Sequence, residues 1–147
     1  MIRRIVITTL ASAAFAAILT ACGTPPADLD LTLRHPSAQG RFLVQMDPPA
    51  QGPGINQMHA WQVSVSTKDG VPVSQARISI DGGMPQHGHG LPTKPRATRE
   101  LEPGTYLVEG MKFSMTGWWD FKLGIQSVDA SDTAVFNVIV DESGIRR

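Results

Sequence analysis

The chain has 147 residues, a single cysteine, and 13 basic against 13 acidic side chains, so its formal net charge is zero. This balance provides no strongly basic surface for phosphate contacts, and we expect no nucleic-acid partner. A single cysteine excludes a disulfide framework and a site built from several thiolates. The length suits one folded domain.

The first residues resemble a bacterial lipoprotein signal. "MIRR" supplies two arginines, and an uncharged run of apolar and small residues follows from Ile5 to Leu19, an order typical of a secretory signal. The run ends in "LTAC", which resembles a lipobox, so we expect cleavage before Cys22 and lipidation of its thiol. The alternative is an ordinary secretory signal with an incidental cysteine.

Lipidation of Cys22 predicts a protein that is anchored in a membrane rather than spanning it. Residue 23 is glycine and not aspartate, which by the same resemblance favours the outer membrane of a Gram-negative bacterium. We therefore expect residues 1–21 to be a signal peptide, residues 22–28 to be a tether, and residues 29–147 to be one periplasm-facing domain.

Apolar and polar residues alternate along most of this domain. The clearest case is "HAWQVSVST", where His59, Trp61, Val63 and Val65 share one face of a half-buried strand. About seven or eight such strands, at roughly 8- to 12-residue spacing, predict an all-β, immunoglobulin-like antiparallel β-sandwich. The other alternating segments are Leu29–Leu33, Arg41–Met46, Ala76–Asp81, a strand from Thr105, Trp119–Ile125 and Thr133–Val140.

The segment "GGMPQHGHGLP", Gly82 to Pro92, interrupts this pattern. On an extended backbone, His87 and His89 point the same way and can bind one metal ion. Imidazole nitrogen suits copper, zinc and nickel, whereas thioether sulfur selects Cu(I). Met84 lies three residues before His87, so the spacing makes this loop a candidate soft-metal site, with Cu(II), Zn(II) and Ni(II) as alternative ions.

Three further donors depend on how the strands pair. Met111 and Met115 share one face if "EGMKFSMTGWW" is extended, so one or two thioethers can approach the histidines. His59 starts a core-facing strand, where a polar side chain needs a partner. The alternative for each is structural: methionines that fill the core, a hydrogen-bonded core histidine, and loop histidines that face water.

Several short motifs occur together: a Met-Pro-x-His-x-His-Gly loop, then Gly-x-Tyr, then Met-x-Gly-x-Trp. Over about Ile55 to Val140 this combination resembles the YtkA-like and FixH-like family of bacterial extracytoplasmic domains. The resemblance implies an immunoglobulin-like sandwich, and some relatives are linked to copper handling and to the assembly of copper-dependent oxidases. The matching residues are Met84, Pro85, His87, His89, Gly90, Gly104, Tyr106, Met115, Gly117 and Trp119.

The first functional hypothesis is a lipid-anchored periplasmic protein that binds copper as Cu(I) and holds it or delivers it to a copper-dependent enzyme or transporter. His87 and His89 are its nitrogen donors, Met84 and Met115 its thioether donors, and His59 is a further candidate.

The second hypothesis is a metal-free interaction module that docks a membrane or periplasmic partner. Trp118 and Trp119 point to opposite faces of their strand, so one of them is expected to be exposed, where it would suit an interface. We expect no catalysis, because the chain contains no G-x-S-x-G, H-E-x-x-H, P-loop or G-x-G-x-x-G motif and keeps no free cysteine once Cys22 is lipidated.

Overall fold

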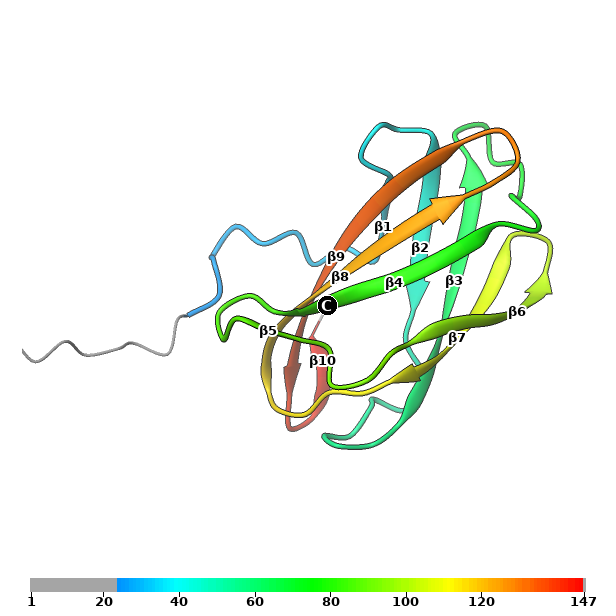
Figure 1. Cartoon of the computed structure of the whole chain (residues 1–147). Helices are drawn as coiled ribbons and strands as arrows, with labels where there is room; N and C mark the ends of the chain where they lie inside the picture. Colours follow the sequence, from blue (N-terminus) through cyan, green and yellow to red (C-terminus); the bar gives the residue numbers. More distant parts are fainter. Residues whose placement is uncertain (1–23, 147) are drawn as a thin grey trace, which may run out of the picture.

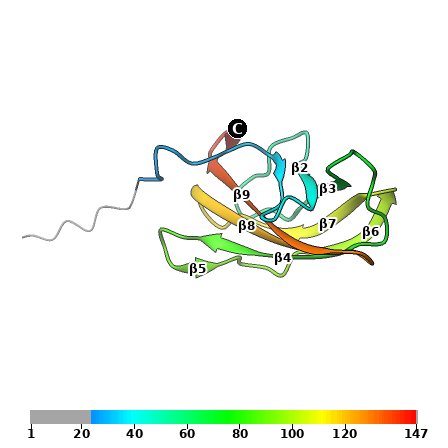
Figure 2. The ribbon, with the colours of Figure 1, turned by 90° about the horizontal axis from the view of Figure 1, so that it is seen from above.

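The computed structural model describes residues 24–146, which form a sandwich of two antiparallel β-sheets (Figure 1 and Figure 2). The predicted signal peptide and Cys22 lie outside the described residues, so their processing stays a prediction. In the described part no helix has the length and hydrophobicity that crossing a bilayer requires.

Each sheet has five strands, and most strands that are neighbours in a sheet also follow one another in the chain. The first sheet has the order β1-β2-β3-β7-β6 and the second the order β10-β9-β8-β4-β5. The first sheet contains β1 (Arg34–Pro36), β2 (Phe42–Asp47), β3 (His59–Thr67), β7 (Thr105–Met111) and β6 (Arg96–Glu102). The second contains β10 (Gly144–Arg146), β9 (Ser131–Asp141), β8 (Gly117–Gln126), β4 (Arg77–Met84) and β5 (His89–Gly90).

The prediction of an all-β antiparallel sandwich is confirmed, although residues 24–146 form ten strands rather than seven or eight. Six of the seven expected strands are present, but Leu29–Leu33 forms none. The strands that the pattern did not predict are β1, β5 and β10, of two or three residues each, and the seven-residue β6. A run of two or three residues is too short to show an alternating pattern, and β6 (RATRELE) is almost entirely polar. Each of them lies at an edge of its sheet, where pairing with a single neighbour is enough to form it.

The core lies between the sheets and follows the alternation of the longer strands. Trp61, Val63 and Val65 of β3 are buried, as the sequence pattern predicted. The second sheet contributes the buried faces of β8 and β9, which pair continuously from Gly117–Val140 to Gln126–Ser131. Burying one such large side chain stabilises the fold by about 1.5–3 kcal/mol, so the sandwich is held mainly by these facing stripes.

The connections between strands gather at two ends of the sandwich (Figure 1). We call the first the histidine end: it contains residues 48–58, the turn 85–88 and residues 112–116. We call the second the far end: it contains residues 37–41, residues 68–76 and the turn 127–130. The candidate donors lie at or next to the histidine end.

Candidate functional site

The two loop histidines belong to a tight turn that joins β4 to β5. Met84 and His89 are directly paired across this two-residue ladder. The backbone N–H groups of His87 and Gly88 both donate to the Met84 carbonyl, at 3.0 Å each. Gly88 adopts φ of +66°, a left-handed conformation that favours glycine. The turn therefore reverses the chain between the two histidines.

Gly83 allows the turn to close against its own strand. A side chain at this position would collide with the backbone carbonyl oxygen of His89. The β4–β5 ladder can therefore form at its present spacing only with glycine here. This close approach holds His89 beside the end of β4.

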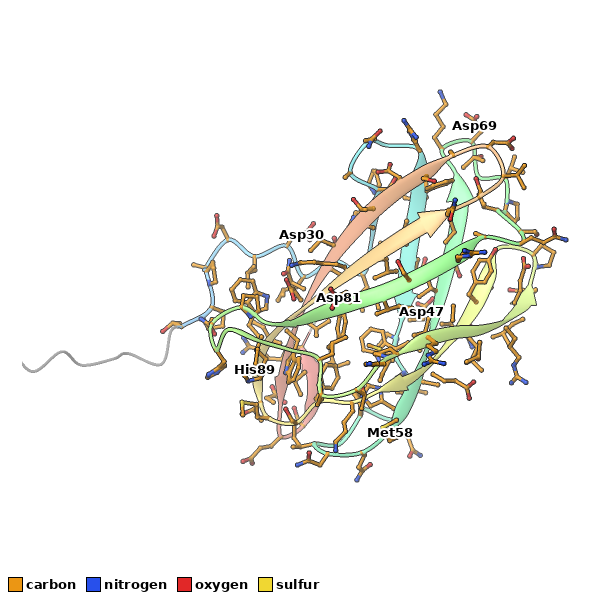
Figure 3. The ribbon with its side chains drawn as sticks, viewed as in Figure 1. Asp30, Asp47, Met58, Asp69, Asp81 and His89 are labelled. Carbon is orange, nitrogen blue, oxygen red and sulfur yellow. The ribbon has the colours of Figure 1, made fainter. Side chains whose placement is uncertain are left out.

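The rings of His87 and His89 lie next to each other on the surface. Their centroids are 5.8 Å apart and their planes differ by 25°, and both side chains are exposed; Figure 3 shows His89 at the margin of the molecule. A metal–nitrogen bond of about 2.0–2.1 Å implies centroids roughly 5–6.5 Å apart when two imidazoles share an ion. The observed spacing is in that range, but a turn produces it and not the extended backbone that the sequence suggested.

The Met84 side chain, on the strand with which His89 pairs, is only 1% exposed. Residues paired directly across antiparallel strands project to the same face, so Met84 and His89 lie on one side of the ladder. The Met84 methyl group packs over Gly117, where an added Cβ would come within 2.8 Å of it. Met84 and His89 also line one shallow hollow of about 220 Å³. The structure therefore brings Met84 and His89 together, with His87 adjoining.

Met115 is connected to the histidine pair through Trp119. The buried Trp119 ring lies edge-on to His89, with 6.3 Å between centroids. Its indole N–H donates to the Met115 carbonyl at 3.2 Å. Met115 itself is 41% exposed in the segment that precedes β8. The sequence predicted that one of Trp118 and Trp119 packs in the core, but it gave no sign that Trp119 contacts both His89 and the backbone of Met115.

His59 is separated from the loop by two aromatic rings. The ring centroids of His59 and Phe113 are 5.1 Å apart, and those of Phe113 and Trp119 are 5.4 Å apart. Trp119 is the ring that contacts His89. Met111, its partner on β7, is buried in the core. The structure thus places His59 next to the aromatic core and not beside His87 and His89.

The hydrogen bonds of His59 define its tautomer. Its Nδ1 accepts a hydrogen bond of 2.9 Å from the Trp61 indole N–H, so Nε2 carries the proton of the neutral ring. Burial lowers the pKa of His59 to about 4, which keeps the ring neutral. Nε2 is buried and finds no hydrogen-bond partner among the described residues. A neutral imidazole binds metal through its unprotonated nitrogen, which here is engaged by Trp61.

Within residues 24–146, no three His, Cys, Asp or Glu side chains come together in a way that could hold a metal ion. A metal site on this loop therefore needs donors beyond the two imidazoles. The buried thioether of Met84 is the donor that the fold places on the same side as His89. Two nitrogens and one thioether form a set suited to Cu(I).

The YtkA-like family model matches residues 42–124, which is more than half of the chain. The chain therefore belongs to the YtkA-like family. The match begins earlier than the motifs suggested, at Phe42 in β2, and ends within β8 at Gly124. No curated protein matches the chain. Among solved structures, the ZirS C-terminal domain is similar at 13% identity, with 93% of this chain and 84% of that one covered and a TM-score of 0.40.

Proposed function

We propose that the protein is a lipid-anchored periplasmic protein that binds Cu(I) through His87 and His89, with Met84 as the thioether donor. Cys22 is the proposed lipid attachment site, and a copper-dependent enzyme or transporter is the proposed recipient of the ion. Membership of the YtkA-like family, taken with the secretory signal, favours an extracytoplasmic role.

One observation carries this proposal: Met84 and His89 are paired across a ladder that closes only with glycine at position 83, and the His87 ring lies beside them. The ligand side chains are held by backbone pairing and not by a long mobile loop. Because His87 and His89 are exposed, an ion bound there would be accessible for exchange. Met115 serves as a further candidate donor from the neighbouring segment.

The test is a Cu(I) titration of residues 23–147 in competition with a chromophoric chelator. We expect one equivalent to bind to the wild-type protein and no specific binding to the His87→Ala/His89→Ala variant. Met84→Leu should weaken binding at least tenfold. Met46→Leu is the matched control, because Met46 is equally buried but belongs to β2. Leu for Met conserves volume, so both single variants should fold.

Two results would contradict the proposal. One is a folded wild-type protein that binds no Cu(I). The other is equal binding by the double histidine variant, which would move the site elsewhere. Equal weakening by Met84→Leu and Met46→Leu would remove Met84 from the ligand set and leave the two imidazoles.

The alternative function is a metal-free docking module. Trp118 supports it only in part, because the side chain is half-buried and its indole N–H donates to Asn137 Oδ1 at 3.0 Å. A protein that binds copper is stabilised by it through mass action, whereas a metal-free module is not. Thermal unfolding with and without one equivalent of Cu(I) separates the two functions.

A further inference from the structure

The connections at the two ends of the sandwich differ in charge. At the histidine end, residues 48–58 and 82–93 contain no Asp, Glu, Lys or Arg, and residues 112–119 contain only Lys112. Other formal charges also lie close to this end: Lys94, Asp141 and Glu142 in its connections, Asp47 at the end of β2, and Asp120 and Lys122, which line the same hollow as His89. At the far end, residues 37–41 contain Arg41, residues 68–76 contain Lys68 and Asp69, and residues 127–130 contain Asp129, whereas the β6–β7 turn at residues 103–104 is uncharged.

Exposed apolar side chains occur at both ends and do not by themselves distinguish them. The histidine end exposes Met58, at 62%, and Met115, at 41%. The far end exposes Val71, at 59%, and Val128, at 92%. The difference lies in the neighbouring charges. Met58 follows an uncharged run, residues 48–57, and Met115 has one charged residue, Lys112, within four positions. Val71 and Val128 lie only one or two positions from an aspartate, Asp69 or Asp129. The long histidine-end connections, with fewer charges and two exposed thioethers, are the less costly of the two sets of connections to remove from water.

The N-terminal segment reaches the fold at the level of the histidine end. The Asn137 side-chain amide donates to the Asp30 carbonyl at 3.1 Å. Across the second sheet, Asn137 is paired with Asp120, Asp120 with Gly83, and Gly83 with Gly90. Asp30 therefore lies about three strand spacings, or roughly 14 Å, from β5 at the same level along the strands. Figure 3 shows Asp30 and His89 on one side of the molecule and Asp69 away from both.

The tether joins the fold closer to the histidine end than to the far end. Seven residues lie between Cys22 and Asp30, and the eight steps from one to the other span at most about 28 Å when the chain is fully extended. From Asn137, the far end at Asp132 lies a further ~17 Å along β9. Figure 2 shows the N-terminal segment entering at the end of the molecule where β5 lies, with β8 and β9 between this segment and β4–β5.

We propose that the histidine end rests on the lipid surface to which the protein is anchored, with Met58 and Met115 at the contact. This inference depends on the proposed lipidation of Cys22 but not on copper binding. It places the His87 and His89 rings at the membrane surface. Any ion they hold is then exchanged within reach of the bilayer and not in the open periplasm.

The experiment uses the full-length lipidated protein in vesicles of phosphatidylethanolamine and phosphatidylglycerol that carry an acceptor dye on the headgroups, without added copper. The mass of the isolated protein is measured first, and an unlipidated Cys22 would overturn the proposal. A donor dye is attached through Thr116→Cys at the histidine end or Asp69→Cys at the far end, both at exposed positions. We expect at least twofold more energy transfer from position 116. Equal transfer, or more from position 69, would overturn the proposal.

A second pair of variants separates lipid contact from the geometry of the tether. Met58→Asp adds a charge at the histidine end, and Val71→Asp is its matched control at the far end, because both residues are exposed to a similar degree. Met58→Asp should lower energy transfer from position 116, and Val71→Asp should leave it unchanged. An unchanged signal in both variants would assign the orientation to the tether alone and overturn the lipid contact. The His87→Ala/His89→Ala variant should orient like the wild type, which keeps this result independent of the copper titration.

Discussion

The two ends of the sandwich are stabilised in different ways. At the far end, the buried Asp132 carboxylate accepts hydrogen bonds from the Ser37 hydroxyl and from the backbone N–H groups of Gln39 and Arg41. The Tyr106 hydroxyl, also buried, donates to the Val73 carbonyl and accepts from the Ala76 N–H. Here side-chain hydrogen bonds fix the connections to the strands.

At the histidine end, backbone geometry and aromatic packing hold the connections in place. The β4–β5 turn closes on its own carbonyl groups, and Phe113 and Trp119 fill the space between His59 and His89. One end therefore uses its polar side chains for stability, whereas at the other the backbone holds the turn and leaves the two imidazoles exposed while Met84 is buried.

The largest expected effect is at the far end. Asp132→Ala removes the acceptor shared by several donors of residues 37–41 and leaves them unsatisfied. We expect a loss of about 2–4 kcal/mol in the free energy of unfolding, measured by urea denaturation. Asp129→Ala, at an exposed position in the adjacent turn, should change it by no more than about 0.5 kcal/mol. Similar effects of the two variants would show that Asp132 does not hold this end.

A single methyl group tests the histidine end. Gly83→Ala forces β5 away from β4, and we expect a loss of about 1–3 kcal/mol in stability together with faster exchange of the Leu91 amide, which donates to the Gly82 carbonyl. Cu(I) affinity should fall at least tenfold. Gly90→Ala is the control, since its Cβ would meet the Gly82 carbonyl oxygen at an ordinary 3.5 Å. If both variants behaved like the wild type, the ladder would not depend on the close approach at Gly83.

The smallest effect concerns the pH dependence of His59. Burial lowers the pKa of His59 to about 4 in the folded protein, whereas its ordinary pKa is 6.5. Between these two values the unfolded chain therefore binds the proton more readily than the folded protein does. The contribution of His59 to the free energy of unfolding should therefore be complete above pH 6.5 and should fall by about 1–2 kcal/mol as the pH drops towards 4. This magnitude allows for solvent screening, because the ring is only half-buried. Urea denaturation at each pH measures this slope, which His59→Gln should reduce and His35→Gln should retain. A slope that persists in His59→Gln would have another origin.

Much of the fold was predictable because long half-buried strands carry a period of two. The burial of Trp61, Val63 and Val65, and of Trp119 rather than Trp118, follows from alternation alone. The short edge strands were not predictable, because their pairing depends on neighbours distant in the chain. Asp132 was missed for a similar reason: its donors lie more than 90 residues away, so a lone aspartate in a strand gives no local sign of burial.

The candidate site was predictable in its residues but not in its geometry. The loop sequence identified His87, His89 and Met84, and the structure brings these three together. The sequence could not show that a left-handed Gly88 reverses the chain between the histidines, since glycine permits that conformation without requiring it. Nor could it separate His59 from the loop, because the intervening rings of Phe113 and Trp119 come from other segments.

The small size of β1 has a mechanical consequence. A protein held by its N-terminus transmits tension from the anchor first to the Asp30–Asn137 hydrogen bond and then to β1, which has only three residue pairs with β2. β2 is held to β3 by six pairs, and β8 to β9 by ten. Under a pulling force β1 should therefore detach first and lengthen the tether. The β4–β5 turn belongs to the other sheet and to its opposite edge, so the histidine loop would keep its shape while the anchored edge yields.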